Sequence, residues 1–276
     1  MERNPNCRCL LCLKEKSTKK NSHIIPRFIV KTIFTNSPQR KAFIWDTSSL
    51  QNKPEPCQDS AKEDYILCPS CEKYFEILET YVSEFLHKRI LNKKYSDNFS
   101  FEKLGQINFV RCIKLNPLIS KLFFISIFWR CSITQRKPFN VFHIDEQEAL
   151  RVQLLKFKVI KIQKLLNINP IEFKDENEII VIKSTNLFEQ SKNIVYAQKA
   201  QTQDYGIVMN EYIVYLLFDE TPINNNFLKF KNNNKVELKV ILVNDSIWTE
   251  LKNNIIEDLI TEKIKKIYER APNHSS

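Results

Sequence analysis

Two pairs of cysteines constrain the fold of this chain more than any other feature of its sequence. Cys9 and Cys12 form the first pair, and Cys68 and Cys71 form the second, with two residues between the cysteines of each pair. A turn of this kind lets both sulfurs of a pair reach one ion, and Zn²⁺ binds four thiolates tetrahedrally at about 2.3 Å. The two pairs therefore predict one closed, structural zinc site. The alternative is that one or both pairs are buried thiols.

Several features favour a cytoplasmic protein without a membrane span. The first residues lack the apolar segment of a secretory signal peptide. The longest apolar run, 118–129, is interrupted by a lysine and is shorter than the ~20 residues that a membrane-spanning helix needs, which favours a buried helix. In a reducing compartment, cysteines serve as metal ligands or buried thiols rather than disulfides. We expect Cys112 and Cys131 to be core residues and Cys7 and Cys57 to be spare ligand candidates.

The positive charge of the chain is concentrated around its first cysteine pair. The formal net charge is +10, and residues 1–41 hold ten Lys or Arg against two Glu. A polyanion such as nucleic acid is therefore expected to meet this end of the chain. The alternative is a solvated basic surface that only aids solubility.

The segments that flank the cysteine pairs differ in their apolar spacing. The stretch 22–34 is apolar but contains Pro26, so a strand is expected to end just before this proline. A short strand is expected at 43–45. Directly after the second pair, apolar residues recur at intervals of three and four over 74–86, which is typical of a helix.

Helical spacing continues through the middle of the chain. One helix is expected at 106–132, with a break near Pro117. Another is expected at 145–166, with Asp145 as its N-cap. We therefore expect this part of the chain to be mainly helical.

Beyond Pro170, β-branched and aromatic runs replace the helical spacing. Polar tracts rich in asparagine divide these runs, which is typical of an antiparallel sheet joined by hairpins. The expected strands are 178–183, 194–198, 205–218 and 236–243, and the expected closing helix is 246–270.

These patterns predict an α+β fold in three parts. Residues 1–95 form a zinc-binding domain, 96–170 a helical segment, and 171–276 an α+β domain with an antiparallel sheet and a closing helix. With only two glycines, the chain cannot contain the glycine-rich loops of dinucleotide-binding folds or of P-loop enzymes.

Two further motifs give the N-terminal region a resemblance to a known group. Ser22–Pro26 reads SHIIP, and the second cysteine pair lies in LCPSCE, which leads into the expected helix. This order resembles the zinc-stabilised HNH endonuclease group, which has a treble-clef fold. The chain is more closely similar to an uncharacterised bacterial family that shares SHIIP, LCxxCE and a later apolar segment ending in Trp-Arg, here Trp129 and Arg130.

The resemblance implies roles for two residues. His23 matches the general base, which deprotonates a water that attacks the scissile phosphate while a divalent cation stabilises the leaving group. Ser22 stands where the group has an acidic or histidine metal ligand, and Glu72 where it has a histidine or asparagine. Glu72 is therefore a candidate ligand for Mg²⁺ or Mn²⁺. The alternative is that His23 is structural, and Glu76 and Glu79 are expected to form a solvated helix face.

Three functional readings follow. In the first, the chain is a metal-dependent nuclease or nuclease-derived effector, for which the resemblance suggests a role in bacterial anti-phage defence, and Arg27, Lys31, Arg40 and Lys41 hold the phosphate backbone. In the second, it is a zinc-stabilised module with a degenerate HNH site that binds nucleic acid without cleaving it, while the C-terminal domain meets a protein partner or ligand. The third is a purely structural interaction protein.

Overall fold

The computed structural model describes eleven stretches of the chain. They are 3–35, 42–44, 55–57, 59–87, 89–90, 92–169, 177–185, 195–199, 205–218, 225–233 and 237–251. Arg40, Lys41 and most of the expected closing helix lie outside the described residues. In the described part, no helix combines the length and the apolar character needed to cross a bilayer.

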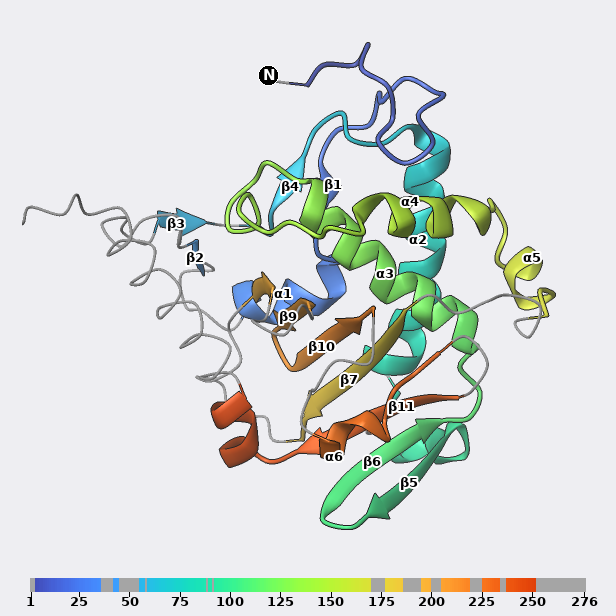
Figure 1. The fold of residues 1–276 in the computed structure, drawn as a ribbon, viewed down its shortest axis with the longest axis vertical. Coiled ribbons are helices and arrows are strands. Elements are labelled where there is room, and N and C mark those ends of the chain that lie inside the picture. Colours follow the sequence, from blue (N-terminus) through green and yellow to red (C-terminus); the bar gives the residue numbers. More distant parts are fainter. Residues whose placement is uncertain are drawn as a thin grey trace, which may run out of the picture.

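A seven-stranded sheet forms the centre of the fold, in the order β5-β6-β11-β7-β10-β9-β8 (Figure 1). Its strands are β5 (Phe99–Leu104), β6 (Ile107–Cys112), β7 (Glu178–Ser184), β8 (Val195–Lys199), β9 (Tyr205–Met209), β10 (Tyr212–Leu217) and β11 (Leu238–Val243). The predicted α+β class is confirmed. The predicted sheet is antiparallel except for β7 and β11, which are parallel because the chain passes through β8, β9, β10 and α6 (Asn225–Leu228) between them.

The expected helix 106–132 is wrong in its first half. Residues 107–112 form β6, which pairs with β5 through a turn at Gly105 and with β11 on its other side. Gly105 has φ +60°, a conformation that favours glycine. The hairpin lies within 96–170, so this segment adds two strands to the sheet as well as helices. The apolar residues of 107–112 fit both helical and strand spacing. Pairing with β11, which lies far away in the sequence, makes this segment a strand.

Helix α3 (Pro117–Ile133) is the axis of the helical layer. Asn116 caps it by accepting a hydrogen bond from the N–H of Ile119, and Pro117 occupies the first turn. All its residues from Leu118 to Ser132 are buried. The lysine in this run is no exception, because Lys121 Nζ donates to the carbonyl oxygen of Asn177 at 2.5 Å.

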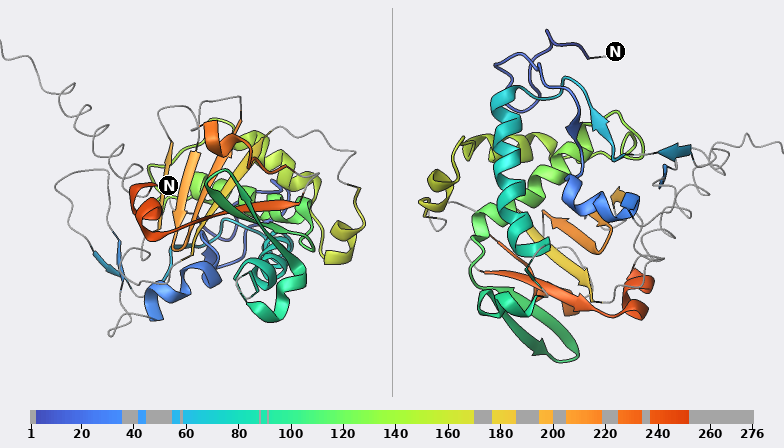
Figure 2. Two further views of the ribbon diagram at one scale, coloured as in Figure 1. Left: turned by 90° about the horizontal axis from the view of Figure 1, so that it is seen from below. Right: turned by 180° about the vertical axis from the view of Figure 1, so that it is seen from behind.

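The helices cover one face of the sheet. Figures 1 and 2 show α3 lying across this face, with α2 (Pro69–Val82) and α4 (Gln147–Lys156) beside it. The expected helix 145–166 is two helices, α4 and α5 (Ile162–Leu166), and α4 begins after Glu146 rather than Asp145. The opposite face of the sheet packs against a smaller cluster that includes Phe230 and Trp248.

The N-terminal region is built from short elements. They are β1 (Ser22–His23), α1 (Arg27–Thr35), β2 (Ala42–Ile44), β3 (Glu55–Cys57), β4 (Lys62–Glu63), α2, the π-helical turn η1 (Ser83–His87) and the 3-10 helix η2 (Lys93–Asn98). β1 pairs with β4, and β2 with β3, both antiparallel. As expected, β1 ends before Pro26, but α1 follows directly after this proline, where no helix was expected.

One hydrophobic core joins the three predicted parts of the chain. It runs from Cys9 through α2 and α3 to Val240 in β11. Phe28 of α1 stacks on Phe123 of α3, with ring centroids 5.9 Å apart. The N-terminal elements therefore depend on α3 for burial.

This shared core makes a stability prediction. Phe123 is 1% exposed, and we expect Phe123→Ala to lower the free energy of unfolding by about 3–5 kcal/mol, because it leaves a cavity between α1 and α3. Denaturant unfolding of the full chain measures this loss. Val152→Ala, at a side chain that is 51% exposed, is the control and should change stability by less than about 0.5 kcal/mol. Equal effects of the two changes would contradict the packing described.

Candidate functional site

The structure brings Cys9, Cys12, Cys68 and Cys71 together. Their sulfur atoms all lie within 4.8 Å of one another, and all four residues are buried. The sulfurs of Cys12 and Cys68 are 3.8 Å apart. Four sulfurs at about 2.3 Å from a central tetrahedral ion stand about 3.8 Å from each other, so the cluster has the dimensions of a closed metal site.

Local structure explains how each pair is presented. The first pair lies on a tight turn, in which the N–H of Cys9 donates to the carbonyl of Glu15 (2.8 Å) and the N–H of Leu13 donates to that of Cys9 (2.9 Å). Leu13 takes a positive φ of 55° to close this turn. The second pair lies at the start of α2, where Cys68 is the N-cap residue and Cys71 is in the first turn.

The four thiols affect one another's ionisation. A hydrogen bond from Cys71 is the main cause that lowers the pKa of Cys9, with further help from backbone N–H groups. Burial is the main cause that raises the pKa of Cys68. The protein alone therefore favours a thiolate at Cys9 and protonated thiols at Cys68 and Cys71, whose pKa values are raised. A bound cation is the group that would let all four ionise.

Two cations from the middle of the chain approach the cluster. Arg151 Nη1 of α4 donates to the carbonyl oxygen of Leu11, between the first two cysteines, at 2.7 Å. Lys158 Nζ donates to Ser70 Oγ at 2.8 Å, and this hydroxyl is 3.3 Å from the sulfur of Cys68. Burial opposes the charge of Lys158, but the nearby cysteines raise its pKa.

Arg151 and Lys158 were missed by the sequence reasoning. A divalent ion with four thiolates carries a net charge of −2, so two adjacent cations offset the cost of burying it. Their separation from the cysteine pairs along the chain leaves no local signal that could have found them.

His23 lies at the end of β1, half-buried. Its Nδ1 atom is 2.8 Å from Ser60 Oγ. Its carbonyl oxygen accepts a hydrogen bond from Arg130 Nη1 at 2.8 Å. Burial lowers the pKa of His23, and the charge of Lys62 lowers it further. The ring is therefore neutral near pH 7, since an ordinary histidine has a pKa of about 6.5.

Glu72 lies close to β1 and is hydrogen-bonded to Ser22, the residue before His23. Glu72 Oε2 accepts a hydrogen bond from Ser22 Oγ at 2.7 Å. Across the described stretches, the four cysteines are the one set of three or more His, Cys, Asp and Glu side chains close enough to share an ion. Among the described residues, no third His, Cys, Asp or Glu side chain therefore joins His23 and Glu72 to form a preassembled site for Mg²⁺ or Mn²⁺.

Two glutamates, Glu76 and Glu79, were expected on a solvated face of α2, and this prediction is wrong for the second. Glu76 is exposed and pairs with Lys73 on the surface. Glu79 instead accepts a hydrogen bond from Arg130 Nη1 at 2.7 Å, with side chains 22% and 3% exposed, respectively. Arg130 also lies over the ring of Phe75, at 5.1 Å from its centroid. The buried guanidinium draws Glu79 inward, which helical spacing alone does not predict.

The predicted phosphate-binding residues divide into two groups. Arg27 and Lys31 are exposed on α1, while Arg40 and Lys41 lie outside the described residues. Arg27 is also near enough to His23 to lower its pKa. Arg27 and Lys31 therefore place two exposed cations on the helix that follows His23, whereas Lys62 is paired with Asp59.

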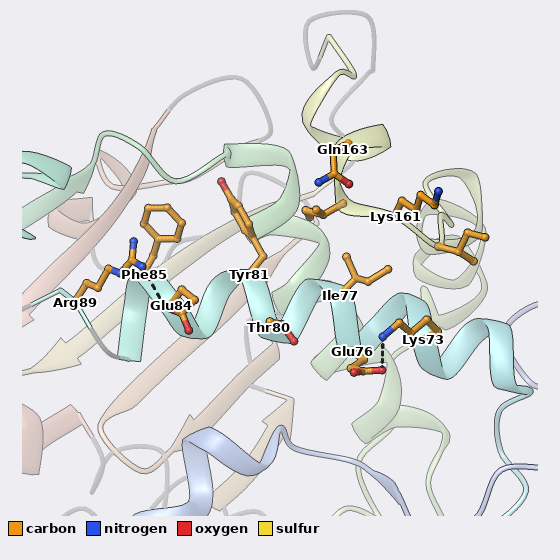
Figure 3. Close-up of a pocket in the computed structure, with 12 residues that line it drawn as sticks. Lys73, Glu76, Ile77, Thr80, Tyr81, Glu84, Phe85, Arg89, Lys161 and Gln163 are labelled. Atoms are coloured by element: carbon orange, nitrogen blue, oxygen red, sulfur yellow. Dashed lines mark hydrogen bonds and ion pairs between the residues drawn. The ribbon is translucent and has the colours of Figure 1, made fainter.

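A groove lies between α2 and the segment that leads into α5. Figure 3 shows Ile77 and Tyr81 of α2 pointing toward the segment that carries Lys161 and Gln163. Its charged rim is paired internally, Lys73 with Glu76 and Arg89 with Glu84. Neither the four cysteines nor His23 is among the residues that line this groove.

The cluster makes a prediction about metal binding. We expect one zinc per full-length chain, with an affinity that falls as the pH is lowered, because the ion must displace protons from thiols whose pKa burial raises. Elemental analysis and chelator competition at two pH values measure this. Cys68→Ser should lose the metal, whereas Cys7→Ser, outside the cluster, should keep it. Metal-free wild type, or equal loss in both variants, would contradict the site.

Searches against protein-family models, curated proteins and solved structures gave no match.

Proposed function

We propose that this chain is a nucleic-acid-directed protein built on an HNH-like, zinc-stabilised treble-clef module. One observation carries the proposal. The hydrogen bond between Ser22 and Glu72 sets the strand of His23 against the first turn of the helix that holds the second cysteine pair. This brings together the histidine strand, the cysteine cluster and the helix, which are the parts of the resemblance.

Zinc is the ion that the cysteine cluster fits best. Thiolates are soft ligands that select zinc over Mg²⁺ or Ca²⁺, and a tetrahedral four-sulfur site is typical of zinc or iron–sulfur centres. A cluster of four buried cysteines leaves no open position for a substrate. We therefore assign the ion a structural role, in which it holds the first turn against α2.

The charge around His23 supports a phosphate-containing partner. Arg27 and Lys31 are exposed on the helix that follows His23. Lys62, directly across the β1–β4 ladder from His23, is a third cation, although Asp59 offsets part of its charge. Such a surface attracts a polyanion through the release of condensed counterions, independently of sequence.

In the catalytic form of this proposal, His23 is the general base. A neutral imidazole can take a proton from a water that attacks a phosphodiester, and the lowered pKa keeps the ring neutral at physiological pH. Glu72 is the candidate ligand for a divalent cation, and because Ser22 donates to its Oε2 atom, Oε1 is the oxygen that would bind the ion. Mg²⁺ or Mn²⁺ would then be recruited together with the substrate phosphate.

The hydrogen bond between Ser22 and Glu72 also favours a second candidate function. It engages Oε2 of the one carboxylate at the predicted ligand positions, and Ser22 offers no carboxylate of its own. In this alternative, the module binds nucleic acid without cleaving it, and the C-terminal sheet is available for a protein partner.

A cleavage assay separates the two functions. If His23 is the general base, His23→Ala should lower cleavage in Mg²⁺ or Mn²⁺ by about 10²- to 10⁴-fold while zinc content and nucleic-acid affinity stay unchanged. Wild-type activity should persist through neutral pH and fall only in acid, because the neutral ring is required. His143→Ala, at an exposed histidine, is the control. A wild type that binds but never cleaves would decide for the binding module.

Salt dependence tests the nucleic-acid partner itself. We expect affinity to fall steeply with salt, and replacing Arg27 and Lys31 together with Gln should reduce the slope of log K against log salt by about 1.8 if each contacts one phosphate. Replacing Lys103 and Lys114 with Gln removes the same charge from exposed positions at β5 and after β6. Binding that does not depend on salt, or equal effects of both double variants, would contradict the proposed nucleic-acid surface at Arg27 and Lys31.

A further inference from the structure

The ring of His23 belongs to a chain of polar contacts that the HNH-like proposal does not use. His23 Nδ1 is 2.8 Å from Ser60 Oγ. Ser60 Oγ is in turn 3.5 Å from Asp59 Oδ1, and the N–H of Ser60 donates to the same oxygen at 2.8 Å. Asp59 is paired with Lys62 through its other oxygen. The row His23, Ser60, Asp59 and Lys62 therefore connects the imidazole to an ion pair.

The hydrogen atoms of this row can be arranged in two ways. A serine hydroxyl has one hydrogen to donate, and it can donate either to the ring nitrogen or to the carboxylate. Although burial opposes it, the pKa of Asp59 is lowered by hydrogen bonds from Lys62 and from the N–H of Ser60. Asp59 is thus ionised and can only accept. Only the arrangement in which the hydroxyl points to Asp59 satisfies both contacts, because the ring nitrogen then donates to Ser60 Oγ at 2.8 Å and the hydroxyl donates to the carboxylate over the longer 3.5 Å.

We propose that Ser60 and Asp59 are positioning residues that hold His23 in the tautomer with a proton on Nδ1, which makes Nε2 the atom that accepts a proton. In this arrangement Nδ1–H donates to Ser60 Oγ, and the Ser60 hydroxyl donates to Asp59. The partner of one ring nitrogen decides which nitrogen is the base. The inference rests on the proposed role of His23 as a base and names the residues that prepare it.

The backbone of His23 is held independently of the ring. Arg130 donates from Nη1 to the carbonyl oxygen of His23, and its guanidinium is itself fixed by Glu79 and by the carbonyl of Ser126. The ring and the main chain are therefore oriented from two sides, by the loop before β4 and by α3. A reactive group works well only when its supporting residues fix its position to within about 0.5 Å.

Nuclear magnetic resonance of the full chain tests the tautomer directly. Long-range nitrogen–proton correlations distinguish a protonated ring nitrogen from an unprotonated one, and His23→Gln assigns the signal among the four histidines. At neutral pH, where the ring is neutral, we expect Nδ1 of His23 to be the protonated atom in the wild type. A wild type with the proton on Nε2 overturns the inference without any variant.

Ser60→Ala provides the second arm. Without the hydroxyl, the ring should shift toward the Nε2–H tautomer, which free histidine favours in water, and Ser60→Thr should restore the wild-type pattern. Ser100→Ala, which removes a hydroxyl from β5, is the matched control and should leave His23 unchanged. An unchanged tautomer in Ser60→Ala also overturns the inference.

The tautomer inference and the nuclease proposal can fail independently of each other. If the protein cleaves nucleic acid, Ser60→Ala should slow cleavage about 10- to 100-fold, as expected for a residue that orients a functional histidine. A wild type with the Nδ1–H tautomer but no cleavage would sink the nuclease proposal and leave the positioning role intact. Cleavage by a protein whose His23 is protonated on Nε2 would do the reverse.

Discussion

The convergence of four buried sulfurs is the contact on which the N-terminal half depends. Cys12 and Cys68 are 56 positions apart in the sequence, yet their sulfurs are 3.8 Å apart. Between them lies the short ladder of β1 and β4, with only two residues in each strand. A ladder of this length cannot stabilise itself, because too few hydrogen bonds offset the entropy of ordering the chain. The cluster closes the loop and holds the strand of His23 against α2.

Helix α3 supplies the second support. Its C-terminal end holds both strands of the ladder, because Arg130 donates to the carbonyl of His23, and Thr134 beyond it donates to the carboxylate of Glu63 in β4 (2.5 Å). The same helix is buried among α2, α4 and the sheet. The histidine region therefore rests on the core of the whole protein. Substitutions in α3 are therefore expected to disturb the region around His23 even when the substituted residue does not contact it.

The surroundings of His23 suit a proton acceptor near phosphate, while the surroundings of Glu72 suit a structural role. Burial and the charge of Lys62 keep the imidazole neutral, which a general base requires. Glu72 accepts a hydrogen bond from Ser22, which stands where the proposed HNH-like site would have an acidic ligand. Both forms of the proposed function, a nuclease that completes its metal site with the substrate and a binding module that lacks one ligand, are compatible with this arrangement.

Local sequence determined the cysteine pairs, the helix behind the second pair and most strands of the sheet, because these depend on spacing within a few residues. Only the tertiary structure decided that 107–112 is a strand, since β6 needs β11 as a partner. It also decided the inward turn of Glu79 toward Arg130, the approach of Arg151 and Lys158 to the cysteines, and the bond between Ser22 and Glu72. Each of these joins residues that are about 50 or more positions apart, where the balance between desolvation and pairing depends on the neighbours that the fold supplies.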